Sequence, residues 1–94
     1  MIKVHIRRTL TGTDEASLLN LVNQLRATII GRPGYQSSET LKRTDSPGEI
    51  LVVSKWQSRF YWEQWYASQE RAAIQAQIDD LLKSQTQYVI YEYE

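Results

Sequence analysis

Residues 32–68 read RPGYQSSETLKRTDSPGEILVVSKWQSRFYWEQWYAS, and this stretch decides the fold. It begins with a Pro-Gly turn and continues into a largely polar strand, Tyr35–Thr44. A second turn, Asp45–Gly48, leads back into the strand Glu49–Trp56, which is apolar on both faces. After Ser58, aromatic residues recur at helical spacing, and all three tryptophans of the chain lie close together here. The pattern predicts a β-hairpin that runs directly into an aromatic helix.

The flanking sequence supplies two more strands and two more helical segments. Residues 2–10 alternate between apolar and polar side chains, which predicts a strand. A turn at Thr11-Gly12 and an N-cap at Thr13 then start a helix with one apolar stripe, which ends near Gly31. Ser68 is a second cap, so the helical region after the hairpin is expected to break there and to resume. Residues 87–93 are rich in strand-forming side chains and predict the last strand.

The order of these elements is β-α-β-β-α-β. It predicts an α+β fold, a ferredoxin-like antiparallel sheet with its helices on one face, built as a single domain over residues 1–94. Such a sheet leaves its other face uncovered, with Leu51, Val53 and residues such as Ile90 or Tyr91 on it. An apolar face of this kind predicts a partner, and the simplest partner is a second copy of the chain.

Composition excludes several classes of function. Lysine plus arginine and aspartate plus glutamate number 11 each, so a nucleic-acid partner, which requires a basic face, is not expected. The chain has no cysteine and a single histidine, so neither thiolate chemistry nor a metal-ligand cluster is expected. No apolar run is long enough to span a bilayer and no signal peptide is evident, which predicts no membrane association and a cytoplasmic location.

Several short motifs recur along the chain after the first helix. They are PGY-x-S-x-E, SKW, W-x-x-W and S-x-E-R, carried by Pro33, Gly34, Tyr35, Ser37, Glu39, Ser54, Lys55, Trp56, Trp62, Trp65, Ser68, Glu70 and Arg71. Together they resemble the antibiotic biosynthesis monooxygenase domain, and the resemblance extends from Ile2 to Tyr93. The resemblance implies a dimeric α+β barrel. It leaves the chemistry open, because the family includes quinone-forming oxygenases, haem-degrading oxygenases and members of unknown function.

The haem-degrading branch of that family uses an asparagine, a tryptophan and an axial histidine. The tryptophan position corresponds to Trp65, but the asparagine position is Ile6 and the histidine position is Gln75. Haem breakdown is therefore disfavoured. The resemblance to the other branch implies a monooxygenase that acts without haem, flavin or metal on a small aromatic or quinol-like compound.

Seven residues are candidates for a substrate site between the sheet and the helices. Stacking and an apolar lining are expected from the aromatic and aliphatic members, and polarity from the others. These candidates are Trp65, Trp56, Trp62, Ile6, Gln75, His5 and Arg7. The alternative is that the aromatic residues are only core and that the chain is a non-catalytic dimeric domain with a ligand-binding or structural role. A cavity of roughly a few hundred Å³ with convergent polar groups would favour the enzyme.

Overall fold

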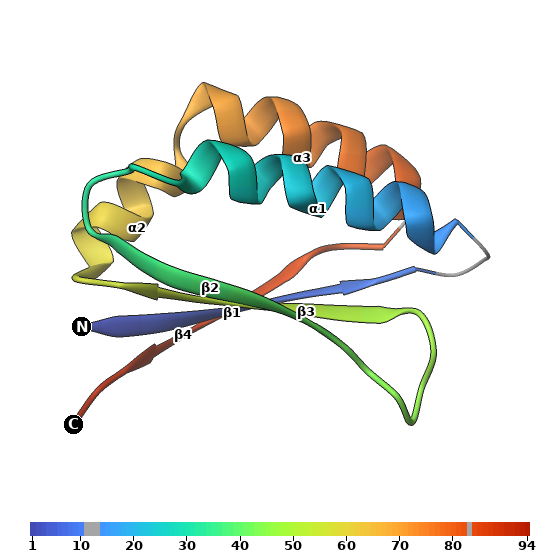
Figure 1. Cartoon of the computed structure of the whole chain (residues 1–94), viewed down its shortest axis with the longest axis horizontal. Helices are drawn as coiled ribbons and strands as arrows, with labels where there is room; N and C mark the ends of the chain where they lie inside the picture. The colour runs from blue at the N-terminus through green and yellow to red at the C-terminus, as the bar shows by residue number, and fades with distance from the viewer. Residues whose placement is uncertain (11–13, 83) are drawn as a thin grey trace.

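In the computed structural model, residues 1–10, 14–82 and 84–94 are described. Four strands form one sheet, and three helices lie together on one of its faces (Figure 1). The elements are β1 (Ile2–Thr9), α1 (Glu15–Ile29), β2 (Tyr35–Lys42), β3 (Glu49–Trp56), α2 (Arg59–Tyr66), α3 (Gln69–Leu82) and β4 (Gln87–Glu92). This confirms the predicted ferredoxin-like α+β fold.

The sheet has the strand order β2-β3-β1-β4, and every neighbouring pair is antiparallel. Ile6 of β1 lies opposite Val52 of β3 and Tyr88 of β4, so these three side chains share one face. Since side chains alternate across a strand, the even-numbered residues of β1 and β3 face the helices and the odd-numbered residues face away. The core forms between this even-numbered face and the apolar stripes of the helices.

The helix boundaries follow local capping. The Asp14 carboxylate accepts a hydrogen bond from the Ser17 backbone amide at 3.4 Å, which starts α1. Thr13, predicted as this cap, and the predicted turn at Thr11-Gly12 lie outside the described residues. The break at Ser68 is confirmed, because its hydroxyl accepts from the Arg71 amide at 3.3 Å and begins α3.

Two side chains do not lie on the face where they would be expected. Arg8 is charged, so a surface position would be usual for it, but it is only 2% exposed and faces the helices. Ile90 also packs against the core, so the open face carries Val89 and Tyr91 from β4 instead. Both corrections follow from the register, which places even-numbered residues of β1 and β4 on the inner face. Ser38 of β2 lies opposite Ser54 and is inward-facing as well, so a polar side chain reaches the interior there.

Candidate functional site

A small, partly open cavity of about 40 Å³ lies between the sheet, α1 and the aromatic helix α2. A space of that size has room for only a few water molecules. The inner face of the sheet, α1, α2 and α3 all contribute to its walls. Its lining residues are Ile6, Arg8, Val22, Leu25, Arg26, Ile29, Ser38, Val52, Ser54, Trp62, Trp65, Arg71 and Tyr88.

The apolar wall contains three of the predicted site residues. Trp62 and Trp65 are each 4% exposed and come from consecutive turns of α2, so both indoles face the sheet. Ile6 closes the opposite side. Trp56 does not line the cavity. Its indole N–H donates to the Ser54 hydroxyl at 3.1 Å and its ring meets Trp62 edge-on at 6.0 Å, so its role in this structure is packing.

The polar wall begins with Arg8 and Gln75. Arg8 Nη2 donates to Gln75 Oε1 at 2.8 Å, and Gln75 Nε2 donates to Thr86 Oγ1 at 3.0 Å and to Asp79 Oδ1 at 2.9 Å. Gln75 is 7% exposed and lies behind Arg8 rather than in the cavity lining. It therefore holds Arg8 in place. The Nε of Arg8 is buried and has no hydrogen-bond partner in the described part of the chain.

A second arginine completes this wall. Arg71 Nη2 donates to the Tyr88 hydroxyl at 3.0 Å. The Arg71 guanidinium also lies 4.1 Å from the ring centroid of Tyr66 and 5.6 Å from that of Tyr88, and the two tyrosine rings meet at nearly right angles. Arg71 is 7% exposed, so aromatic rings replace most of its hydration.

The two buried guanidinium groups have no carboxylate partner among the described residues. Burial lowers the pKa of Arg8, and the Arg71 cation nearby lowers it as well. Burial raises the pKa of Tyr88, and the cations of Arg71 and Arg8 oppose that shift only in part. Tyr88 is consequently a neutral phenol at pH 7. Its oxygen accepts from Arg71, which leaves its own proton available to a ligand.

A wider groove lies on the other side of the polar wall. It has a volume of about 400 Å³ and runs between α3 and β4, where Asp79 and Gln85 form part of its lining. Arg71 and Tyr88 line both the groove and the small cavity. These two side chains therefore form part of the boundary between the two spaces.

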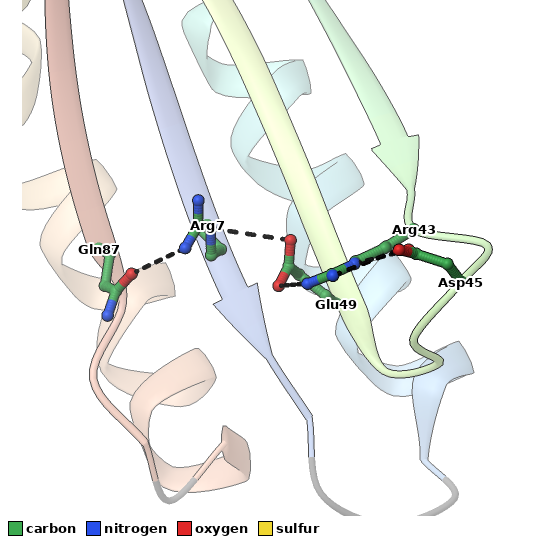
Figure 2. Close-up of polar contacts among 5 residues, drawn as sticks. All are labelled: Arg7, Arg43, Asp45, Glu49 and Gln87. Atoms are coloured by element: carbon green, nitrogen blue, oxygen red, sulfur yellow. Dashed lines mark hydrogen bonds and ion pairs between the residues drawn. The ribbon is translucent and has the colours of Figure 1, made fainter.

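The structure places His5 and Arg7, two predicted sources of polarity, on the opposite face of the sheet. Both are odd-numbered residues of β1. The His5 ring packs against the Tyr91 ring at a tilt of 56°, with centroids 4.8 Å apart. Arg7 lies between Gln87 and Glu49, at 3.5 and 3.7 Å, as Figure 2 shows on the side of the sheet away from the helices. Neither His5 nor Arg7 lines the cavity, whose polar residues include Arg8, Arg71 and Tyr88 instead.

Sequence reasoning missed Arg8, Arg71 and Tyr88 as cavity residues. One signal was present for Arg8, since it continues the even-numbered inward series of β1 after Ile6. Arg71 and Gln75 are four residues apart on α3, and this spacing places both on the buried side of that helix. Nothing in the sequence pattern placed the Tyr88 hydroxyl beside Arg71, because that contact joins α3 to β4.

In the described ranges, no three His, Asp or Glu side chains gather as a metal site would require. The single histidine is on the open face, and Gln75 faces Arg8, so the residues present do not fit an axial haem ligand. As for membranes, none of the described helices combines the length and apolar character that crossing a bilayer demands.

Residues 1–77 match the sequence profile of the family described as antibiotic biosynthesis monooxygenase. Solved structures share the fold at low identity. A conserved protein from Methanosarcina mazei is 16% identical with a TM-score of 0.90, over 99% of this chain and 92% of that chain. Rv0793 from Mycobacterium tuberculosis is 17% identical with a TM-score of 0.88, over 99% and 94%. SnoaB, a cofactor-independent oxygenase from Streptomyces nogalater, is 14% identical with a TM-score of 0.87, over 99% and 92%. No curated protein matches the sequence.

Proposed function

Because the chain belongs to the antibiotic biosynthesis monooxygenase family, we propose that it is a cofactor-independent monooxygenase that oxidises a small aromatic or quinol-like compound. The observation that carries this proposal is the cavity beneath Trp62 and Trp65. Its mainly apolar lining also includes several polar residues, among them the buried Arg8 and Arg71 and the half-buried Tyr88. An apolar space with a few convergent polar groups is the usual form of a small-molecule site. The likeness to SnoaB supports the same reaction class.

The reaction balances without an added reductant. The ionised substrate transfers one electron to O₂, and the resulting radicals combine into a peroxide at the carbon that is oxidised. Loss of water from that peroxide leaves a carbonyl. A CH₂ group and one O₂ thus give one C=O and one H₂O, and the four electrons that reduce oxygen come from the substrate carbon.

The residues of the cavity can stabilise the charges that develop during this reaction. Arg8 and Arg71 would stabilise the substrate anion and the negative charge that passes to oxygen, in a site from which water is largely excluded. Tyr88 is neutral and would donate its proton to a peroxide oxygen. Among the residues that line the cavity itself there is no carboxylate or histidine. The adjoining groove holds one carboxylate, Asp79, so the substrate would lose its proton to Asp79 or to solvent, or would arrive already ionised.

The cavity is too small to hold a planar aromatic substrate as it stands. About 40 Å³ is far below the roughly 300–1,000 Å³ of pockets that bind drug-sized ligands. A planar substrate would fit only once the cavity joins the groove of about 400 Å³ across the wall of Arg71 and Tyr88. We therefore propose that substrate enters from the α3–β4 side.

Oxygen uptake by metal-free protein tests the activity. The protein, treated with a chelator, is presented with a panel of anthrones, quinols and flavonoids under an oxygen electrode. The expected result is uptake above the spontaneous rate for one class, with one carbonyl product formed per O₂. Trp65→Phe removes part of the stacking surface and should lower kcat/KM about 2- to 10-fold. Stoichiometric haem binding, with haem degradation by a reductant, would contradict the proposal.

The alternative function is a non-catalytic domain that binds a small ligand. The small volume of the cavity favours this alternative. The two functions separate in one experiment. A compound that quenches the fluorescence of Trp62 and Trp65 on binding but causes no oxygen uptake at saturation identifies a binding domain. A compound that does both identifies the enzyme.

We also propose that the chain forms a homodimer through the open face of the sheet. Val53 is half-buried there although no helix covers it, and Val89 and Tyr91 are 46% and 52% exposed on the same face. Val53→Asp would leave an unpaired charge in the contact, so light scattering should show a folded monomer. Ala73→Asp, on the exposed side of α3, is the control and should remain dimeric. A monomeric native protein would contradict the proposal.

A further inference from the structure

Two positive charges lie in the interior, and among the described residues neither forms an ion pair. These charges belong to Arg8 and Arg71, which are 2% and 7% exposed. A buried charge is normally paired, because removing it from water costs several kcal/mol. The unpaired state of two adjacent cations is therefore the most unusual electrostatic feature of this domain.

The groups that hydrogen-bond or stack on the two cations are neutral, and the charge of Asp79 compensates Arg8 only from a distance. Arg8 meets the Gln75 amide oxygen, and Arg71 meets the Tyr88 hydroxyl and the faces of two tyrosine rings. One carboxylate, Asp79, is within reach, but it binds Gln75 Nε2 on the groove side rather than either guanidinium. The region between the cavity and the groove thus has an excess of positive charge.

One hydrogen-bond donor is also unused. Arg8 Nε is buried, it has no acceptor in the described part of the chain, and Arg8 lines the cavity. Guanidinium groups bind carboxylates through paired, nearly parallel N–H···O bonds, in which Nε commonly takes part. A carboxylate on the cavity side of Arg8 would satisfy this donor and neutralise the charge in one contact.

We propose that this site binds a planar aromatic carboxylate, with the ring beneath Trp62 and Trp65 and the carboxylate between Arg8 and Arg71. The proposal rests on the proposed function only for the aromatic body of the ligand. The charge follows from the two arginines alone. A ligand that already carries a permanent anion also agrees with a cavity lining that contains no carboxylate or histidine.

Matched acids and amides test the charge directly. The probes are 2-naphthoate and 2-naphthamide, which have nearly the same shape, and benzoate with benzamide as a smaller pair. Binding is measured by tryptophan fluorescence with the full chain at pH 7 and confirmed by calorimetry. The expected result is that at least one carboxylate binds 10-fold or more tightly than its amide.

The test variant is Gln75→Glu, because it places a carboxylate against Arg8 with almost no change in the shape of the side chain. It should weaken carboxylate binding about 10-fold and leave amide binding within about twofold. Gln77→Glu makes the same charge change on the exposed side of α3 and should alter neither. Arg71→Gln, which keeps a donor to Tyr88, should also reduce the preference for the acid if Gln75→Glu does not fold.

The outcomes separate this inference from the oxygenase proposal. Equal affinity for acid and amide, no binding of any probe at millimolar concentration, or equal effects of Gln75→Glu and Gln77→Glu would each overturn the anion site. Acid-selective binding without oxygen uptake would leave the anion site standing and remove the oxygenase. Oxygen uptake with neutral quinols, without a preference for acids over amides, would support the oxygenase and overturn the anion site.

Discussion

Replacing Gln75 with leucine tests whether the amide oxygen of Gln75 holds Arg8 in the interior. The substitution removes the 2.8 Å bond to Arg8 Nη2, and hydrogen bonds to charged groups are each worth about 1.5–3 kcal/mol. It also leaves the buried Thr86 hydroxyl without its donor, at about 1 kcal/mol. The expected loss in the free energy of unfolding is therefore about 3 kcal/mol.

The same logic predicts that a second substitution restores stability. Arg8→Met in the Gln75→Leu background removes the buried charge and leaves two apolar side chains of suitable size in contact. Replacing both partners of a buried polar pair by apolar groups is often close to neutral. The double variant should therefore be more stable than Gln75→Leu alone, with a coupling free energy of about 1–3 kcal/mol.

Denaturant unfolding, followed by tryptophan fluorescence at one fixed protein concentration, gives all four corners of this cycle. A fixed concentration matters because a dimer would make stability depend on it. Gln77→Leu is the control, and as an exposed change on the same helix it should stay within about 0.5 kcal/mol of the native chain. Additive effects of the two substitutions would refute the reasoning, since they would mean that Gln75 does not stabilise the buried Arg8 charge.

Two further predictions concern the backbone and pH. Gly34→Ala should cost more stability than Gly31→Ala, because both glycines have positive φ but only at residue 34 would a Cβ fall onto the Tyr61 ring. Thermal unfolding of the two variants makes the comparison, and equal losses would contradict it. Burial raises the pKa of Tyr88 in the folded state, so its contribution to stability is present below the unfolded pKa of about 10 and is lost as pH rises through the folded value. Tyr88→Phe should therefore lose less stability than the native chain between pH 9 and 11, and parallel pH profiles would count against this.

The sequence was sufficient for the fold because each element carries its own pattern. Alternation in residues 2–10, the apolar run of β3 and the cap at Ser68 are local signals, and all three appear in the structure where they were predicted. The residues of the cavity could not be predicted in this way. Its polar wall joins β1, α3 and β4, so it depends on the strand register and on the packing of α3, which no local pattern encodes.

The particular errors follow from that difference. The alternating pattern of a strand assigns residues to its two faces. It does not show which polar side chains can be buried on the inner face. Arg7 and Arg8 are adjacent and chemically identical, yet one bridges Glu49 and Gln87 on the open face and the other is buried against Gln75. The alternation of β1 places Arg8 on the inner face and Arg7 on the open face, and Gln75 on α3 is the partner that allows the inner arginine to be buried.

A domain of 94 residues has little stability to spare, which makes the burial of Arg8 and Arg71 informative. Residues 2, 4 and 6 of the same strand face are apolar and buried, so a methionine or leucine at position 8 would continue the core without the loss of hydration. Arg8 instead breaks the pattern of its own strand, and Gln75 on α3 is placed to receive it. Sites where a sequence departs from its own folding pattern are commonly functional, because selection there acts on something other than stability. Arg8 therefore gives the strongest reason to search for a ligand, and the double variant that should be more stable than Gln75→Leu is also the one expected to lose the carboxylate.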